Sequence, residues 1–418
     1  MFNLFRKSLW NRRGTAILTI FSISISVTLL IGVENIRKGV RTSFSSAVSG
    51  TDIIVGARGG SLQLLLYSIF RIGNSPNNIS WESYNELRNN KRVKWTIPIS
   101  LGDSHRGFRV VGTNLDYFKY FRYGSKKKLE FLKGKPFSKV FDTVIGSEIA
   151  IKFNYKLNEK IIIAHGTGKK SFLNHDDKPF KIVGILKPTG TPVDQSLHVI
   201  LEGITAMHVD WESGAPPMEG ESISAEEVLK LDLTPEEITS FLIGLKSKIH
   251  VFDLQRKINT YKEEPLSAIM PGVALQELWN ILRTAETGLR VITWFVLFAG
   301  LLGMVTSLLS GLNERRREMA ILRSVGAGPG TISFLLILEA TVLTLAGIIF
   351  GLFILYLALF VSQPILEAYF GLFIPINLPS NRDIITLGGI LLTAMLMGII
   401  PALRAYYQSL ADGMTIRL

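Results

Sequence analysis

Four apolar segments, each long enough to cross a lipid bilayer, divide this sequence of 418 residues. A hydrocarbon core about 30 Å thick requires about 20 apolar residues in a helix. The segments are residues 15–33, 291–312, 331–361 and 384–402, and Glu339 is the one charge within them. Hydrophobic residues make up 47% of the chain and charged residues only 19%, which argues against a disordered chain and against an ordinary soluble enzyme. We therefore expect an integral membrane protein with four spanning helices.

The Lys and Arg residues of the short connections predict the orientation of these helices. Residues 1–14 hold four basic residues, residues 313–330 hold another four, and the link between the last two segments has only Arg382. Short connections rich in Lys and Arg remain in the cytoplasm. Both termini and residues 313–330 are therefore predicted to be cytoplasmic, and residues 35–274 are predicted to lie outside.

The long segment 35–274 has the pattern of an α+β domain. Stretches rich in β-branched residues predict strands, and helical patterns lie between them. The predicted strands are residues 94–99, 108–111, 143–145, 160–164, 180–186, 198–201 and 248–252. The predicted helices are residues 81–89, 148–153, 204–208, 225–231 and 254–261. The first half is basic and the second acidic, which indicates two lobes or one face suited to an anionic neighbour such as lipid headgroups; the alternative is a solvated surface with uneven charge. Residues 215–220 are expected to form an exposed loop.

A helical seam precedes the second apolar segment. Its apolar residues step by three and four, as the a and d positions of a coiled coil do. They are Leu275, Leu278, Leu282, Ala285 and Leu289. We expect one helix over residues 275–312, which could carry motion across the membrane boundary; the alternative is an amphipathic helix packed on its own domain.

The cytoplasmic segment 313–330, NERRREMAILRSVGAGPG, combines both signs of charge with one apolar side and ends in glycine and proline. Such a helix at the membrane surface suits docking of a cytosolic partner. The alternative is a simple positive-inside signal, which needs only the arginines. The candidate docking residues are Glu314, Arg315, Arg316, Arg317, Glu318, Met319, Ile321, Leu322 and Arg323.

Two further apolar features have open interpretations. Residues 61–70 are too short to span and form either a core helix or a surface against the outer leaflet or a partner. The residues available for such a contact are Leu62, Leu64, Leu65, Leu66, Tyr67 and Phe70. Glu339 is costly in lipid, so it is expected to face the protein interior in a structural role.

The sequence offers little for catalysis or metal binding. It has no cysteine, and all six histidines lie in residues 35–274. His175 with Asp177 and His208 with Asp210 are the candidate metal ligands, but their spacings are not compact, so no metal site is expected. No GxSxG or HExxH motif occurs, and residues 163 and 170 break the only near match to a phosphate-binding loop. We expect neither an enzyme nor a bound nucleotide.

The docking segment, with Glu339 between Leu338 and Ala340 and with the PALRA sequence at residues 401–405, resembles the FtsX-like permease family. That family contains the MacB, LolC/LolE and FtsX-type membrane subunits of type VII ABC transporters. Residues 134–137, 144–150 and 180–186 resemble its MacB-like periplasmic domain. Only 14 residues precede the first segment, so the chain is similar to the split LolC/LolE type rather than to MacB with its fused ATPase.

The resemblance implies a non-catalytic permease subunit in the bacterial inner membrane, with its large domain in the periplasm. Implied partners are a cytosolic ABC ATPase dimer that holds ATP and Mg, a second copy or homologous permease, membrane lipid and a periplasmic adaptor or substrate protein, but no nucleic acid. The implied regions are 1–14, 15–34, 35–274, 275–312, 313–330, 331–361, 362–383, 384–403 and 404–418.

The resemblance also implies mechanotransmission, in which ATP hydrolysis moves a periplasmic domain that acts on lipoprotein, peptide, drug or lipidic cargo. The first alternative is an FtsX-like signalling scaffold that regulates a periplasmic partner and transports nothing. A weaker alternative is metal-related binding by the histidines of the outer domain.

Overall fold

The computed structural model describes residues 12–166, 175–211, 223–314, 321, 324, 326–370 and 376–407. The chain forms two compact units. The helical unit comprises Met1–Gly39, Arg283–Ile365 and Ile374–Leu418, and the α+β unit comprises Val40–Leu282 and Leu366–Phe373. The expected loop at residues 215–220 and most of the docking segment lie outside the described residues.

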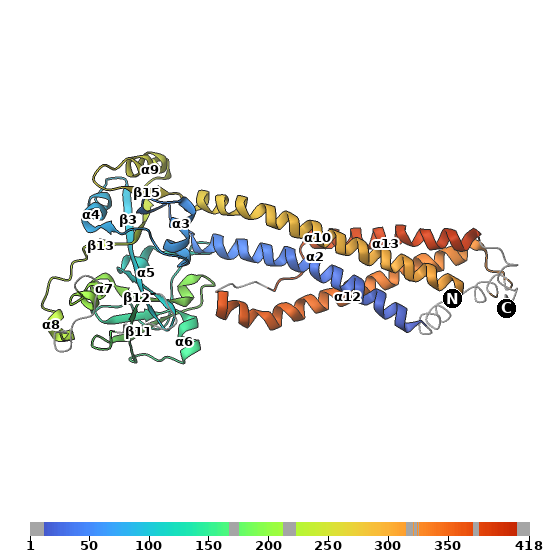
Figure 1. Ribbon diagram of the computed structural model, residues 1–418, viewed down its shortest axis with the longest axis horizontal. Helices are drawn as coiled ribbons and strands as arrows, with labels where there is room; N and C mark the ends of the chain where they lie inside the picture. The colour runs from blue at the N-terminus through green and yellow to red at the C-terminus, as the bar shows by residue number, and fades with distance from the viewer. Residues whose placement is uncertain are drawn as a thin grey trace. The chain divides into compact units, whose positions relative to one another are not determined.

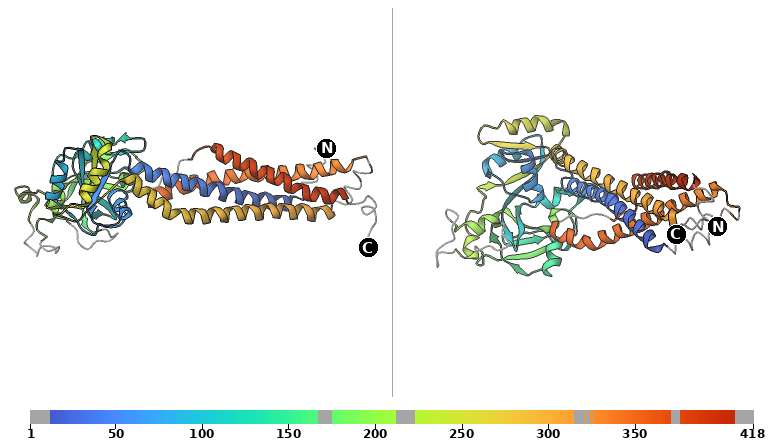
Figure 2. Two further views of the ribbon diagram at one scale, coloured as in Figure 1. Left: turned by 90° about the horizontal axis from the view of Figure 1, so that it is seen from above. Right: turned by 45° about the vertical axis from the view of Figure 1, so that its right-hand side comes forward.

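Four long helices contain the four apolar segments and lie side by side (Figures 1 and 2). They are α2 (Arg13–Ala47), α10 (Pro271–Glu314), α12 (Pro329–Phe370) and α13 (Asn381–Tyr407). By length and composition each can cross a membrane. The predicted fold class, with one helix before a large α+β domain and three after it, is confirmed. Each helix is longer than the apolar segment that it contains, because hydropathy marks only the part suited to lipid.

Small residues bring two of these helices close together. The Ser24 hydroxyl of α2 donates a hydrogen bond to the carbonyl oxygen of Gly347 in α12 at 3.0 Å. A Cβ atom added at Gly351 would lie 2.8 Å from the Ser24 carbonyl oxygen. Gly347 and Gly351 form a GxxxG pattern, whose lack of side chains permits backbone contact between membrane helices. Outward from these contacts, residues such as Phe353 and Phe360 expose their rings, as a lipid-facing surface requires.

The α+β unit is built on one mixed sheet of eleven strands among the described residues, in the order β15-β1-β14-β3-β4-β12-β8-β11-β7, with β10 beside β3 and β9 beside β11. The pairs β4/β12 and β8/β11 are parallel and the others antiparallel. The strands are β1 (Ile53–Ala57), β3 (Val93–His105), β4 (Phe108–Thr113), β7 (Phe131–Gly134), β8 (Asp142–Ile145), β9 (Lys160–Ile161), β10 (Ala164–His165), β11 (Phe180–Leu186), β12 (Ser196–Ile200), β14 (Ser240–Leu245) and β15 (Leu266–Ile269). Two short pairs, β2 (Ile79–Ser80) with β13 (Glu237–Ile238) and β5 (Arg122–Tyr123) with β6 (Lys127–Lys128), lie apart from it.

Helices cover both faces of this sheet. Alternate residues of β1 enter different cores: Ile54 packs with Leu65 and Trp279, whereas Ile53 packs with Tyr84. A sheet buried on both faces needs apolar residues at every strand position, which explains the continuous apolar run of β1. The short helices are α3 (Ser61–Leu65), η1 (Leu66–Phe70), α4 (Trp81–Arg88), α5 (Asp116–Tyr120), α6 (Ser147–Phe153), η2 (Pro192–Gln195), α7 (Leu201–His208), α8 (Ala225–Val228), η4 (Lys248–His250) and α9 (Val251–Asn259).

The predicted strand at residues 248–252 is wrong, because this stretch forms η4 and the first turn of α9. Ile249 and Phe252, whose types suggested a strand, are exposed, whereas Leu254 and Ile258 bury one side of the helix at a spacing of four. The strand of this region is β14, which is buried along its whole length and has no alternation to reveal it. The prediction for residues 180–186, by contrast, is confirmed by β11.

Residues 61–70 belong to the core of the α+β unit. Leu64, Leu65, Tyr67 and Phe70 are buried, and the Phe70 ring stacks on Phe44 with centroids 4.3 Å apart. For these four residues the alternative of membrane or partner contact is wrong, since their side chains are taken up by the core. Leu62 and Leu66, the other two candidates, are half-buried.

Candidate functional site

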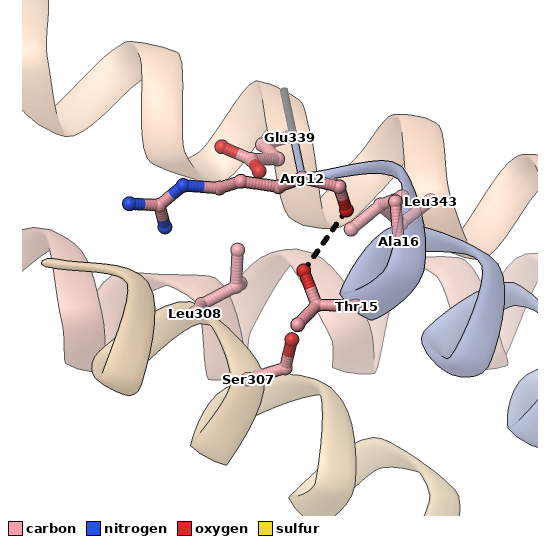
Figure 3. Close-up of a pocket in the computed structure, with 7 residues that line it drawn as sticks. All are labelled: Arg12, Thr15, Ala16, Ser307, Leu308, Glu339 and Leu343. Atoms are coloured by element: carbon pink, nitrogen blue, oxygen red, sulfur yellow. Dashed lines mark hydrogen bonds between the residues drawn. The ribbon is translucent and has the colours of Figure 1, made fainter. Parts of the chain in front are cut away.

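A buried carboxylate marks one polar site of the helical unit. Glu339 in α12 is 5% exposed and lines a small cavity with residues of α2 and α10 (Figure 3). The Arg12 side chain lies beside Glu339, and the Thr15 hydroxyl donates to the Arg12 carbonyl oxygen at 3.0 Å. A carboxylate surrounded by protein avoids the cost of contact with lipid. The site therefore joins three helices.

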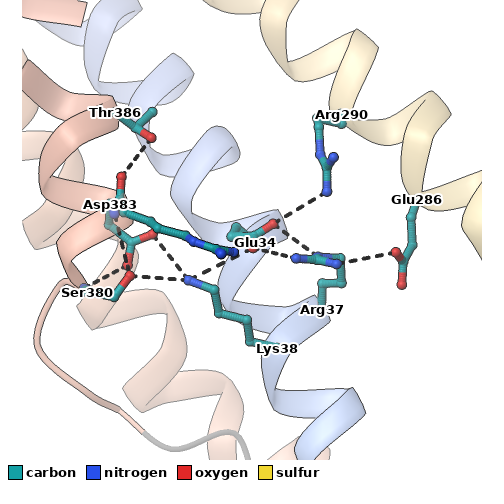
Figure 4. Close-up of polar contacts among 9 residues, drawn as sticks. Glu34, Arg37, Lys38, Glu286, Arg290, Ser380, Asp383 and Thr386 are labelled. Atoms are coloured by element: carbon teal, nitrogen blue, oxygen red, sulfur yellow. Dashed lines mark hydrogen bonds and ion pairs between the residues drawn. The ribbon is translucent and has the colours of Figure 1, made fainter. Parts of the chain in front are cut away.

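A second polar site holds α2, α10 and α13 together (Figure 4). Arg37 of α2 donates to both carboxylate oxygens of Glu34, at 2.6 and 3.0 Å. Its other terminal nitrogen lies 3.5 Å from a carboxylate oxygen of Glu286 in α10. The Arg37 guanidinium is thus shared between one carboxylate of its own helix and one of a neighbouring helix.

Lys38 extends this network to α13. Its ammonium lies 3.4 Å from Asp383 Oδ1 and 3.3 Å from Ser380 Oγ. Ser380 caps α13, because its hydroxyl oxygen accepts from the Asp383 backbone N–H at 3.4 Å. In return, the Ser380 backbone N–H and hydroxyl both donate to Asp383 Oδ2, at 2.8 and 2.6 Å. The first turn of α13 is therefore linked to α2, because the Asp383 carboxylate of the cap also forms an ion pair with the Lys38 ammonium.

The ion pairs of this network affect how the helices are placed in the bundle; we assign them no catalytic role. Arg37 and Glu286 are partly shielded, with side chains 21% and 17% exposed. Ion pairs of this kind contribute about 0.2–1 kcal/mol each, so they stabilise the bundle little but favour one relative rotation of its helices. A guanidinium that can redistribute between two carboxylates is the kind of contact that differs between two states of a helix bundle.

The predicted seam residues all lie on α10 but in different surroundings. Leu275 is buried in the core of the α+β unit and Leu278 is half-buried. Leu282, Ala285 and Leu289 are exposed. Of the predicted docking residues, Glu314 ends α10 and Ile321 is exposed, while Arg315, Arg316, Arg317, Glu318, Met319, Leu322 and Arg323 lie outside the described residues.

The four candidate metal ligands are divided between two groups. Asp177 and Asp210 bind the buried ammonium of Lys178, at 3.0 and 2.7 Å. His175 and His208 instead face each other, with ring centroids 5.1 Å apart. The pairing of each histidine with the aspartate two residues after it therefore does not describe the arrangement of these side chains.

Parts of this network are recognisable in the sequence. Glu34, Arg37 and Lys38 follow the first apolar segment at the three- and four-residue spacing of helical ion pairs. Ser380 and Asp383 have the spacing of a capping box. Neither spacing predicts which residue of another helix contacts Arg37.

Comparisons with known proteins agree with this architecture. The family model described as FtsX-like permease C-terminal matches residues 290–410, and the MacB-like periplasmic core domain matches residues 16–258. A search of curated proteins found no match.

Two similar solved structures are single domains of transporters. One is the extracellular domain of the noncanonic ABC-type transporter YknZ from Gram-positive bacteria, with 15% identity over 52% of this chain and 98% of that one and a TM-score of 0.30. The other is the periplasmic region of MacB from Actinobacillus actinomycetemcomitans, with 10% identity over 56% of this chain and 96% of that one and a TM-score of 0.33.

Proposed function

Because this chain belongs to the FtsX-like permeases of ABC transporters that carry a MacB-like periplasmic core domain, we propose that it couples ATP hydrolysis by a separate cytosolic ATPase to movement of its α+β unit. Family matches at residues 16–258 and 290–410 support this role. In this proposal both termini are cytoplasmic, the α+β unit is periplasmic, and ATP and Mg are bound by the partner. The cargo is a lipoprotein, peptide, drug or lipidic molecule.

The observation that carries the proposal is the continuity of α10. It is one helix of 44 residues, and no proline follows its first residue. At about 1.5 Å per residue such a helix is about twice as long as a hydrocarbon core about 30 Å thick. Leu275 and Trp279 bury its first turns in the core of the α+β unit, and its last two residues, Asn313 and Glu314, begin the docking segment. A displacement of the docking segment can therefore be passed along α10 without a hinge.

Two further features support coordinated motion. The ion pairs of Arg37 and Lys38 connect α10 and α13 to α2, so these helices would move together. Leu282 and Leu289 of the seam are exposed in the single chain. Exposed apolar residues at a and d positions suit packing against a second helix of the same kind. A second copy or a homologous permease is therefore the proposed membrane partner.

The docking role is tested with charge reversal. The chain is purified from native membranes, and the ABC ATPase that accompanies it is identified by mass spectrometry. Glu314→Lys with Glu318→Lys should lower recovery of this ATPase several-fold and lower the ATP hydrolysis of the complex, because both charges change sign at the proposed contact. Glu226→Lys with Glu263→Lys, two exposed positions of the α+β unit, is the control. Unchanged recovery and hydrolysis in the docking variant would refute the coupling role.

The same complex distinguishes a transporter from a signalling scaffold. After reconstitution into vesicles, ATP hydrolysis that rises with a released lipoprotein, peptide or lipid supports transport. Hydrolysis that responds only to a stoichiometric periplasmic protein, with no cargo released, supports the scaffold.

A further inference from the structure

Three histidines and one aspartate converge in the α+β unit. They are Asp103, His165, His175 and His208, and one ligand atom of each lies within 4.8 Å of all the others. Asp103 on β3 and His165 on β10 are direct neighbours across antiparallel strands. His208 is the last residue of α7, and His175 precedes β11. We propose that these four side chains form a binding site for a divalent transition metal ion, best suited to zinc.

The spacing of three of the four ligand atoms already fits a tetrahedral ion. His165 Nδ1 lies 3.2 Å from His208 Nε2 and 3.2 Å from Asp103 Oδ1, and His208 Nε2 lies 3.4 Å from Asp103 Oδ1. With metal–nitrogen distances of about 2.0–2.1 Å, the ligand atoms of tetrahedral zinc lie about 3.3 Å apart. A ligand atom of His175 lies within 4.8 Å of the other three, so His175 would provide the fourth ligand.

The neutral rings of His165 and His208 have too few N–H groups to satisfy the acceptor atoms of the cluster. His208 Nδ1 lies 3.0 Å from the Ile204 carbonyl oxygen, to which the neutral ring donates its one N–H. His208 Nε2 is then a lone pair directed at His165 and Asp103. Only His165 Nδ1 could place a proton between the three atoms while both rings are neutral. A cation satisfies all of these acceptors at once, and a backbone carbonyl on the distal nitrogen is the usual way to orient a metal-binding histidine.

His175 provides an independent observation. Its side chain is 1% exposed, and among the described residues its Nε2 has no hydrogen-bond partner. Buried polar atoms are nearly always paired, so an unpaired ring nitrogen in a residue of this cluster points to a missing ligand. The His175 backbone N–H donates to the Ile163 carbonyl oxygen at 3.0 Å, which fixes the position of the ring.

A buried ion pair holds the two ligand-bearing segments together. The fully buried Lys178 ammonium donates to both carboxylate oxygens of Asp210, at 2.8 and 2.7 Å. Lys178 lies three residues after His175, and Asp210 lies two residues after His208. The Trp211 ring covers the cluster, with its centroid 4.5 Å from that of His175 and 5.5 Å from that of His165. Such a prearranged and shielded setting favours metal binding.

The donor set also indicates what the ion would do. Three imidazoles and one carboxylate suit zinc, whereas magnesium and calcium require oxygen ligands. Four protein ligands leave no open position for water or substrate, so the ion would be structural and not catalytic. It would connect β3, β10, the segment before β11 and the end of α7. This role is independent of the proposed ATPase coupling.

The first test uses the full-length chain in detergent, purified with a histidine-free affinity tag, freed of metal with a chelator and titrated with zinc chloride. We expect one zinc ion per chain by mass spectrometry of the metal. Cobalt chloride should give the visible absorption of a tetrahedral cobalt site, which zinc then abolishes. A wild-type chain that binds no stoichiometric zinc would overturn the proposal, whatever the variants do.

The second test assigns the ligands. Asp103→Asn and His208→Asn should weaken zinc binding by at least about ten-fold, since even outer-shell changes commonly cost about 10–100-fold. The matched controls are Asp232→Asn and His250→Asn, an exposed aspartate and an exposed histidine outside the cluster. Both controls should keep the wild-type affinity and cobalt spectrum. Unaltered zinc binding in Asp103→Asn and His208→Asn, or equal losses in the controls, would show that the ion is bound elsewhere.

Discussion

The Thr28 hydroxyl of α2 donates a hydrogen bond to the carbonyl oxygen of Gly351 in α12 at 2.8 Å. One turn earlier on both helices, Ser24 and Gly347 form the same contact. Because the residue numbers of both pairs rise together, the two helices run parallel. Parallel packing places the beginnings of α2 and α12 at the same end of the helical unit.

Gly351→Ala should destabilise the helical unit, because the added Cβ would lie 2.8 Å from a backbone oxygen of α2. Overpacking of this kind costs about 1–3 kcal/mol. The measurement is the loss of monodisperse protein on heating in detergent. Gly389→Ala in α13 is the control, since among the described residues no atom lies within 4 Å of its added Cβ. Equal midpoints for both variants would contradict a packing role for Gly351.

Arg37 and Glu286 should show energetic coupling in a double-mutant cycle of Arg37→Gln and Glu286→Gln. We expect about 0.2–1 kcal/mol at low salt, since the pair is partly solvated. Because salt screens such pairs, the coupling should shrink as sodium chloride is raised to 1 M. Thermal unfolding in detergent gives the stability of the wild type, the two single variants and the double variant. A zero coupling at low salt would mean that Arg37 acts only through Glu34.

Arg283→Pro should separate ATP hydrolysis from activity of the α+β unit. Proline in the middle of α10 removes one backbone hydrogen bond and clashes with the carbonyl four residues earlier, at a cost of about 3 kcal/mol, and it kinks the helix. The variant should still insert, bind the ATPase and hydrolyse ATP, while cargo release or partner activation is lost. Arg283→Lys, which keeps helix and charge, should behave as wild type. Full activity of the proline variant would show that motion reaches the α+β unit by another route.

His198 should make the α+β unit less stable in acid. Burial, together with the positive charge of Arg71, lowers the pKa of His198 to about 3. Between the ordinary histidine pKa of about 6.5 and this value, the unfolded chain binds a proton that the folded chain does not. The contribution of neutral His198 to the free energy of unfolding is therefore fully present above about pH 6.5. As the pH decreases toward the pKa of His198 in the folded chain, the free energy of unfolding falls by about 1.4 kcal/mol per pH unit.

Urea unfolding followed by tryptophan fluorescence at pH 7 and pH 5 measures this slope. His198→Gln cannot take up the proton, so its stability should decrease less over the same range. The difference between the two slopes isolates His198 from other groups that titrate. Parallel pH profiles for wild type and variant would contradict a neutral buried His198.

The cysteine-free chain allows a direct test of orientation. Lys127→Cys, at an exposed position of the α+β unit, should react with a membrane-impermeant thiol reagent in cells whose outer membrane has been permeabilised. Arg316→Cys in the docking segment should react only after the inner membrane is disrupted, because positively charged short connections stay inside. The opposite pattern of reactivity would reverse the proposed topology.

The candidate polar sites could be predicted only in part. Glu339 stood out because a charge inside an apolar segment has few tolerable surroundings. Glu34, Arg37 and Lys38 are recognisable as a helical group, but Glu286 and Asp383, which complete the network, lie about 250 and 345 positions further along the chain. Only the crossing of α2 with α10 and α13 decided that these carboxylates would meet Arg37 and Lys38.

The amino-acid sequence by itself determined the four spanning helices, the α+β character between them and the family, because apolar length and short motifs are properties of contiguous residues. The tertiary structure decided what residues 61–70 pack against, and it brought Asp103, His165, His175 and His208 together. Neither result follows from spacing along the chain. The antiparallel register of β3 and β10 places Asp103 beside His165, and the Lys178–Asp210 pair connects the segments that carry His175 and His208. Distances between side chains from four separate segments depend on strand register and helix packing, and local sequence does not specify them.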